Sequence, residues 1–157
     1  MNLNRRHFIG ATVATGALLS APVVWGQAKP RVVVIGGGPG GATVARYLAK
    51  DSDGALDVTL IEANPTYTTC FFSNLYIGGM RTFESLQHGY DRMGAGVTVI
   101  HDMAAGVDPD AKTVTLAGGQ VLTYDRLVLS PGIDFKEGSV LGWRLEDAEI
   151  MPHAYKA

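Results

Sequence analysis

Cysteine is nearly absent from this chain of 157 residues, which contains only Cys70. A single thiol excludes a disulfide within the chain and any metal site built from several cysteines. The histidines offer no substitute, because His88 and His101 do not have the spacing of metal ligands. We expect both to be hydrogen-bonded structural residues, and we predict no metal site.

Clustered positive charge is also missing. The chain has 13 Lys and Arg residues against 15 Asp and Glu, and no run rich in Lys or Arg occurs after residue 6. A nucleic-acid-binding surface needs such a cluster to neutralise phosphates, so we predict no nucleic-acid partner. What the chain does have is 46% hydrophobic residues and 20 glycines, a composition typical of one globular domain.

Residues 1–28 lack acidic residues and form a distinct N-terminal segment. The pair Arg5-Arg6 precedes an 18-residue apolar run, 8–25, and small residues follow it up to Ala28. This order resembles a twin-arginine export signal cleaved after Ala28. It predicts a protein of the periplasm whose body begins at residue 29. Because this route carries folded proteins, it also hints at a cofactor inserted before export.

The apolar run 8–25 leaves two other interpretations open. Its length reaches the lower limit for a membrane span, so it could be a retained anchor. Glycine, threonine, serine and proline dilute its hydrophobicity, however, and we expect no stable membrane anchor. It could also be a hydrophobic N-terminus without a targeting role.

A strand–helix–strand unit directly follows this segment. The β-branched run 31–35 predicts a buried strand, the glycine-rich stretch 36–41 a tight turn, 42–50 an amphipathic helix and 57–62 a second buried strand. Together they form a βαβ unit of about 32 residues, the element that builds a parallel sheet.

The turn in this unit matches the dinucleotide-binding fingerprint. Its glycines are Gly36, Gly38 and Gly41, and Glu62 follows 21 residues later at the end of the next strand. The first glycine allows the tight turn, the second lets the backbone approach a pyrophosphate and the third lets helix pack on strand. Glu62 is predicted to accept hydrogen bonds from ribose hydroxyls and to disfavour a 2′-phosphate. The alternative is an ordinary α/β turn with a solvent-facing glutamate.

Two less regular segments come next. Residues 63–79 lack clean periodicity and are predicted to form a functional loop with a short helical turn. Apolar residues then recur at helical spacing behind Thr82, so we expect a helix with Thr82 as its N-cap that runs to about Gly94. Its apolar residues, Tyr90 among them, are expected to belong to the core, as is Tyr76 in the preceding loop.

The second half of the chain is rich in short β segments. Residues 97–100, 106–107, 113–116 and 121–122 are separated by turn residues and predict an antiparallel meander, and 124–130 predict a further strand. The predicted fold class is α/β, a Rossmann-like FAD-binding half-domain with an antiparallel β-meander.

Two features favour FAD over NAD as the dinucleotide. One is the meander after the βαβ unit. The other is residues 123–132, a polar start, an apolar strand and a small-residue turn, which resemble the second FAD-binding motif of the two-dinucleotide-domain flavoproteins. The resemblance implies that Gly132 approaches the FAD. The alternative for Gly132 is a plain strand-ending turn.

The segment around the single cysteine carries a more specific resemblance. In residues 67–79, Thr69-Cys70 is followed closely by Ser73-Asn74. This segment is similar to the flavoprotein subunit of flavocytochrome c sulfide dehydrogenase, and the similarity covers the body from about residue 31 to residue 157. Further segments that carry it are 36–43, 88–91, 101–102, 108–110, 124–126, 131–133 and 152–157.

The resemblance implies that Cys70 bonds covalently to the FAD through the 8α-methyl group of the flavin. A thiolate next to an electrophilic flavin edge can form such a thioether. The alternatives are a buried spectator thiol and an intermolecular disulfide. The candidate cofactor-binding residues are Gly36, Gly38, Pro39, Gly40, Gly41, Glu62, Cys70 and Gly132.

The resemblance also implies a function. It predicts an FAD-dependent oxidoreductase that oxidises sulfide and passes electrons to a c-type cytochrome subunit. Members of that family continue beyond this length, so we expect residues 29–157 to be the truncated N-terminal part of the FAD-binding domain. We place no catalytic residue in it and expect no turnover from it alone. The alternatives are a sulfide:quinone or type II NADH dehydrogenase relative, and a non-catalytic periplasmic FAD-binding module.

Overall fold

A computed structural model describes residues 28–134, 136 and 138–150. The predicted export signal lies outside the described residues except for Ala28, and so does the segment 152–157. No helix in the described part of the chain is long and apolar enough to span a membrane.

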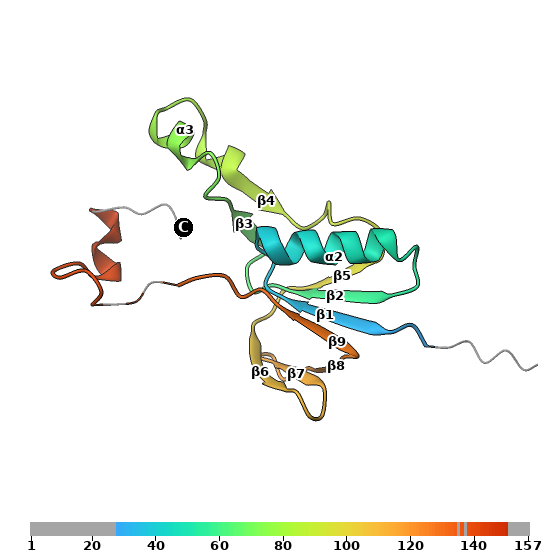
Figure 1. Ribbon diagram of the computed structural model, residues 1–157. Helices are drawn as coiled ribbons and strands as arrows, with labels where there is room; N and C mark the ends of the chain where they lie inside the picture. Colours follow the sequence, from blue (N-terminus) through green and yellow to red (C-terminus); the bar gives the residue numbers. More distant parts are fainter. Residues whose placement is uncertain (1–27, 135, 137, 151–157) are drawn as a thin grey trace, which may run out of the picture.

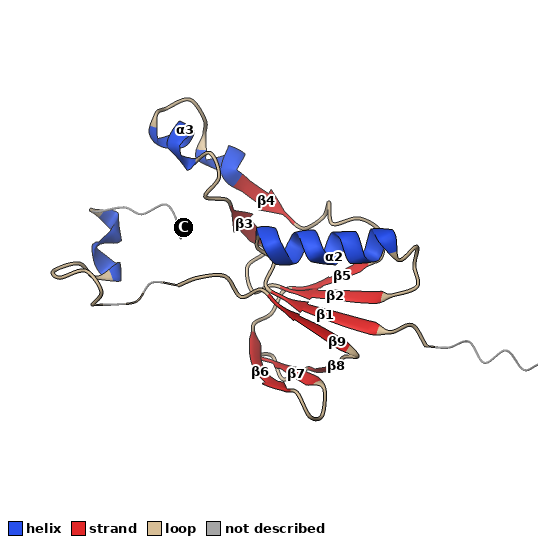
Figure 2. Ribbon diagram, viewed as in Figure 1, coloured by secondary structure: helices blue, strands red, loops and turns tan. Residues whose placement is uncertain are grey.

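A parallel four-stranded sheet with the strand order β5-β2-β1-β9 forms the centre of the structure (Figures 1 and 2). Helix α2 lies across one face of it, and a three-stranded antiparallel sheet, β6-β7-β8, packs against the other. The α/β class predicted from the sequence is confirmed. The bounds of the parallel strands and the helix are β1 Arg31–Ile35, α2 Pro39–Asp51, β2 Asp57–Ile61, β5 Val97–Ile100 and β9 Arg126–Leu129.

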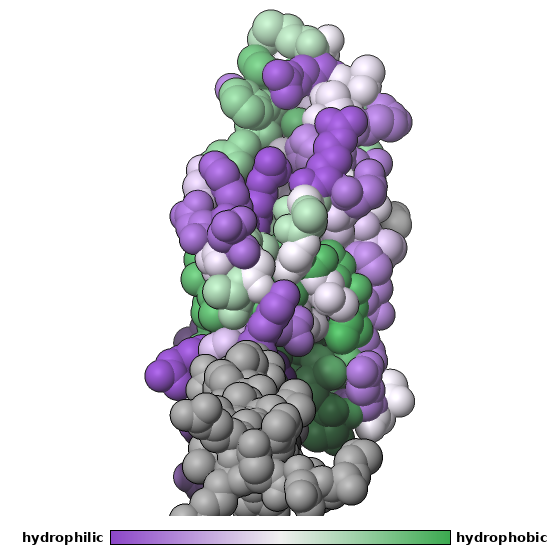
Figure 3. All heavy atoms as spheres, turned by 90° about the vertical axis from the view of Figure 1, so that its right-hand side faces the viewer, coloured by the Kyte–Doolittle hydropathy of each residue, from purple (hydrophilic) through white to green (hydrophobic). Residues whose placement is uncertain are grey.

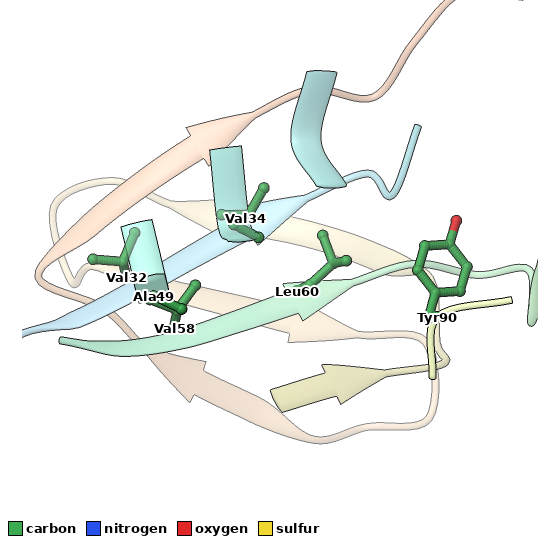
Figure 4. Close-up of a cluster of buried hydrophobic side chains, with 7 residues drawn as sticks. Val32, Val34, Ala49, Val58, Leu60 and Tyr90 are labelled. Carbon is green, nitrogen blue, oxygen red and sulfur yellow. The ribbon is translucent and has the colours of Figure 1, made fainter. Parts of the chain in front are cut away.

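The β-branched residues of β1 are buried on both faces of the sheet. Val32 and Val34 point toward α2, which offers the small side chains of Ala45 and Ala49 there (Figure 4). Val33 points the other way, into a cluster formed with the antiparallel sheet. Burial on both faces explains why the strand is continuously hydrophobic and not alternating.

The antiparallel meander has one strand fewer than predicted. It consists of β6 Ala104–Asp108, β7 Thr113–Leu116 and β8 Val121–Thr123. The prediction that 97–100 belongs to it is wrong, because these residues form β5 and pair in parallel with β2. A run of four β-forming residues does not specify its partner. The long segment between β2 and β5 is what allows a parallel crossover.

The helix predicted from Thr82 to Gly94 is also wrong. Only a 3₁₀ turn forms, η1 Phe83–Leu86, and Thr82 makes no side-chain capping bond. The chain then becomes extended as β4 Gln87–Gly89, which pairs antiparallel with β3 Thr66–Thr68. Pairing with a distant segment satisfies the backbone here and overrides the helical spacing of the apolar residues.

The predicted loop 63–79 contains the expected short helical turn, α3 Ser73–Ile77. It lies at the far end of the two-stranded ribbon β3–β4, which projects from the sheet near the start of α2 (Figure 1). Strand β3 was not predicted. The chain leaves the sheet again after β9, and the last element in its described part is a 3₁₀ helix, η2 Leu145–Glu149.

Hydrogen bonds connect the residue before β9 to the first residue of β1. The carboxylate of Asp125 accepts a hydrogen bond of 2.7 Å from the main-chain N–H of Arg31 and one of 3.3 Å from its guanidinium. These bonds hold the pKa of Asp125 below its usual value. They set the register in which β9, strand 124–130 of the prediction, pairs with β1.

Candidate cofactor-binding site

The glycine turn lies at the carboxyl edge of the parallel sheet, between β1 and α2. Main-chain bonds connect it to its neighbours: the N–H of Gly36 donates to the carbonyl of Ile61 at 2.8 Å, and the N–H of Ser130 donates to Ile35 at 2.8 Å. The ends of β2 and β9 therefore flank the turn. This edge is where α/β sheets bind their ligands.

Two glycines of the fingerprint are required by the protein itself. A Cβ atom on Gly36 would lie 2.0 Å from the carbonyl oxygen of Ser130, and φ at Gly36 is +98°. A Cβ atom on Gly41 would lie 1.9 Å from the carbonyl oxygen of Gly36. Both positions confirm the tight turn and the close helix–strand packing expected from the sequence.

The middle glycine has a different environment. A Cβ atom on Gly38 would have no atom of the described residues within 4 Å, and its φ of −65° is open to any residue. No contact with the residues that the structure describes explains the absence of a side chain at this position. An external group that approaches the backbone would explain it, as in pyrophosphate binding.

Helix α2 begins immediately after this open position. Gly38 is its N-cap, no side chain caps it, and its first turn contains no acidic residue. The N–H groups of that turn and the positive end of the helix dipole suit an anion. Pro39 is the first helical residue, and a Cβ atom on Gly40 would lie 3.1 Å from the Ser130 hydroxyl.

Glu62 lies against the turn, as the sequence predicts for the acid after the second strand. Its Oε2 accepts a hydrogen bond of 2.6 Å from the N–H of Gly37. Its Oε1 accepts bonds from Asn64, at 2.9 Å from the main chain and 3.3 Å from the side chain. A carboxylate has about four acceptor positions, so one remains for a ribose hydroxyl.

Tyr90 also contacts the glycine turn. The sequence did not identify it as a site residue. Its hydroxyl donates to the carbonyl of Gly37 at 3.0 Å, although 52 residues separate the two along the chain. Burial, assisted by the negative charge of Glu62, raises the pKa of Tyr90 to about 12. The sequence placed Tyr90 correctly in the core, where it is 8% exposed. The one available signal was Gly37, a glycine that the fingerprint does not require.

Cys70 lies on the ribbon, between β3 and α3. The thiol is free and half-buried. The ribbon fixes the neighbouring Thr69, whose N–H donates to the carbonyl of Leu86 at 2.9 Å and whose hydroxyl accepts from the N–H of Phe71 at 3.1 Å. Phe72 adopts φ of +66°, an uncommon conformation for a bulky residue.

Several apolar side chains in the segment that follows this cysteine are exposed. Figure 3 shows hydrophobic atoms among hydrophilic ones at the upper end of the molecule, where Figure 1 places α3. Tyr76, expected in the core, is 45% exposed. The exposed apolar residues of this segment are Phe71, Phe72, Tyr76, Ile77 and Met80.

The remaining predicted site residue, Gly132, follows β9 close to the glycine turn. Its φ is +81°, and a Cβ atom there would meet no atom of the described part of the chain within 4 Å. The structure therefore gathers Gly36, Gly38, Gly41, Glu62 and Gly132 at the strand ends, whereas Cys70 lies along the ribbon.

His88 and His101 are both exposed, and the hydrogen bonds expected for their rings are not found among the described residues. The ring of His101 lies 5.6 Å from that of Tyr90, and His88 is part of the β3–β4 ladder. No group of three or more His, Cys, Asp or Glu side chains suited to a metal occurs among the residues that the structure describes.

Comparisons with known proteins show which family this chain belongs to. The profile of the pyridine nucleotide-disulphide oxidoreductase family matches residues 30–142. The sulfide dehydrogenase flavocytochrome c flavoprotein chain of Chlorobaculum thiosulfatiphilum is 54% identical over 44 residues, 28% of this chain and 90% of the relative. The sulfide-quinone reductase of Aquifex aeolicus is 36% identical over 104 residues, 64% of this chain.

A solved structure agrees with these relatives. The sulfide:quinone oxidoreductase of Aquifex aeolicus has a TM-score of 0.62 and 31% identity over 69% of this chain. The chain spans 24% of the length of the Aquifex relative in the sequence comparison. The resemblance to the flavocytochrome c flavoprotein is thus confirmed, and the chain belongs to the pyridine nucleotide-disulphide oxidoreductase family.

Proposed function

We propose that this chain binds FAD and belongs to an oxidoreductase that oxidises sulfide and passes the electrons to a c-type cytochrome. The observation that carries the proposal is Gly38, at the start of α2 without a side-chain cap, where no contact with a described residue requires a glycine. The 54% identity to a flavocytochrome c flavoprotein chain supports sulfide and a cytochrome as substrate and partner.

Each part of the site has a defined role in this proposal. The N–H groups at the start of α2 bind the pyrophosphate, and Glu62 accepts from the adenosine ribose. The carboxylate is held in place for this by Gly37 and Asn64. Gly132 allows close approach of the cofactor after β9. When bound, FAD supplies two-electron redox chemistry.

We further propose that Cys70 holds the flavin by a thioether to its 8α-methyl group. The thiol is half-buried and free, as such a role requires. Phe71 and Phe72 next to it are 58% and 56% exposed, and an aromatic ring system would cover such surface favourably. The positive φ of Phe72 turns the chain sharply at this point, and such strained residues cluster at ligand sites.

A second candidate is electron transfer to a quinone. It is favoured by the 36% identity to the Aquifex sulfide-quinone reductase, which extends over more of this chain than the flavocytochrome c match. The two functions share sulfide and FAD and differ in the acceptor. They are therefore separated by an acceptor assay.

The assay uses the purified full-length protein under anaerobic conditions. Sulfide is expected to bleach the visible flavin absorption, and oxidised cytochrome c is expected to restore it much faster than a soluble quinone does. Faster recovery with quinone would select the second candidate. A flavin that sulfide does not bleach would contradict both.

We also propose that residues 1–28 are a twin-arginine export signal and that the protein works in the periplasm. The proposal rests on the Arg5-Arg6 pair before the apolar run 8–25. Replacing both arginines by lysine is expected to keep the protein in the cytoplasm. Fractionation measures this, and N-terminal sequencing of the exported form is expected to begin at Lys29. A membrane-bound form that retains Met1 would contradict cleavage.

A further inference from the structure

The sequence places few restrictions on the backbone conformation of the peptide between Gly37 and Gly38. Three glycines follow one another here, and glycine backbone adopts many conformations at similar energy. Ordering such a segment only when the cofactor arrives would weaken binding. A contact that holds this peptide in place beforehand would remove that cost.

The structure assigns that role to Tyr90. We propose that its hydroxyl fixes the Gly37 carbonyl so that the N–H of Gly38 faces the phosphates of a bound dinucleotide. Tyr90 is thus a positioning residue that acts through the backbone and touches no cofactor atom. The inference rests on the dinucleotide binding proposed above.

Peptide geometry connects the two groups. The Gly37 carbonyl and the Gly38 N–H belong to one planar trans peptide, so they point in opposite directions. Tyr90 holds the carbonyl at 3.0 Å on the protein side. The N–H is then directed away from Tyr90, toward the side where a Cβ atom on Gly38 would meet nothing. Glu62 binds the preceding N–H, that of Gly37, at 2.6 Å.

The ring of Tyr90 adds a steric constraint to the hydrogen bond. A Cβ atom on Gly37 would lie 2.6 Å from the tyrosine oxygen and 2.7 Å from its ring carbon Cε1. Gly37 is therefore a glycine because Tyr90 packs against it. This explains one of the two glycines, Gly37 and Gly40, that the fingerprint does not require.

Tyr90 is itself rigidly held. It is 8% exposed and belongs to the same buried cluster as Val34 and Leu60 (Figure 4). It follows β4 directly, so it also connects the ribbon that carries Cys70 to the glycine turn. Burial raises the pKa of its hydroxyl to about 12, which keeps the donor protonated at physiological pH.

The test is the variant Tyr90→Phe, which keeps the ring and removes the donor. It is made in the full chain on a Cys70→Ser background, so that flavin can be washed out, and ADP is the probe. We expect the Kd for ADP to rise about tenfold, because the peptide would then have to be ordered when the ligand binds. Replacing Tyr90 by para-aminophenylalanine, which restores an N–H donor, is expected to recover most of the affinity.

Tyr124→Phe is the matched control. Tyr124 is 7% exposed and also donates to a main-chain carbonyl, that of Asp108 at 3.5 Å, but it lies in the cluster on the opposite face of the sheet. We expect no change in the Kd for ADP. An equal loss in both variants would mean general destabilisation and would overturn the inference.

A second measurement needs no variant at Tyr90. In a backbone amide NMR titration with ADP, we expect the Gly38 resonance to shift more than that of Gly37, whose N–H already binds Glu62. The reverse order would overturn the inference even if Tyr90→Phe did not fold.

The outcomes also separate the inference from the proposed function. A parent protein that binds neither ADP nor FAD would refute the proposed function, and the inference with it. If Tyr90→Phe binds ADP as tightly as the parent does, the inference is wrong but the proposed function stands.

Discussion

Replacing Gly38 by valine is expected to give a folded protein without FAD. A Cβ atom here would meet no atom of the described residues within 4 Å, and φ at this position suits valine, so we expect the fold to be retained. It would instead fill the space in which the pyrophosphate approaches the backbone. The flavin content of the purified full-length protein, measured by absorption, is expected to fall to background.

Gly106→Val is the matched control for this variant. Gly106 lies in β6 of the antiparallel sheet, its φ is not positive, and a Cβ atom there would also meet nothing within 4 Å. We expect its flavin content to equal that of the parent. Thermal unfolding of both variants should stay close to the parent. Normal flavin content in Gly38→Val would contradict the pyrophosphate site.

A Cys70→Ser exchange is expected to change how the flavin is held without preventing its binding. The glycine turn and Glu62 do not involve the thiol, so FAD should still bind. In the parent, acid denaturation should leave yellow fluorescence on the polypeptide, whereas in the variant all flavin should be released. A tryptic peptide of the parent that contains Cys70 should carry the added mass of FAD, and the assignment is unambiguous because the chain has one cysteine.

Moving the thiol provides the control for this second variant. In Cys70→Ser combined with Ser73→Cys, the thiol lies at the first residue of α3, and we expect no covalent flavin. The thioether withdraws electrons from the ring, so the Cys70→Ser flavin should also be harder to reduce with sulfide. Flavin released from the unmodified protein by acid, with Cys70 recovered as a free thiol, would contradict the covalent link.

Much of the site was predictable because it depends on local sequence. The spacing of Gly36, Gly38 and Gly41 after a β-branched run identifies the turn, and Glu62 follows from the end of the next strand. Parallel neighbours end at the same edge of a sheet, so proximity of Glu62 to the turn was expected. The structure shows how Glu62 contacts the turn: it accepts a hydrogen bond from Gly37, which is not one of the fingerprint glycines.

Other features could not be predicted from local pattern. The apolar spacing of residues 83–93 suggested a helix, but antiparallel pairing of β3 with β4 keeps part of this segment extended. The same extended backbone carries Tyr90 to Gly37, a contact across 53 positions in the sequence. Long-range hydrogen bonds of this kind leave no periodic signal.

The sequence by itself determined the βαβ unit, the glycine turn with its acid and the α/β class, because turn stereochemistry and two-sided burial act over a few neighbouring residues. Only the tertiary structure decided that 97–100 joins the parallel sheet and that Tyr90 holds the turn. Strand partnership and buried hydrogen bonds depend on which distant segments meet. That choice is made by the free energy of packing the whole chain, which no short window of sequence contains.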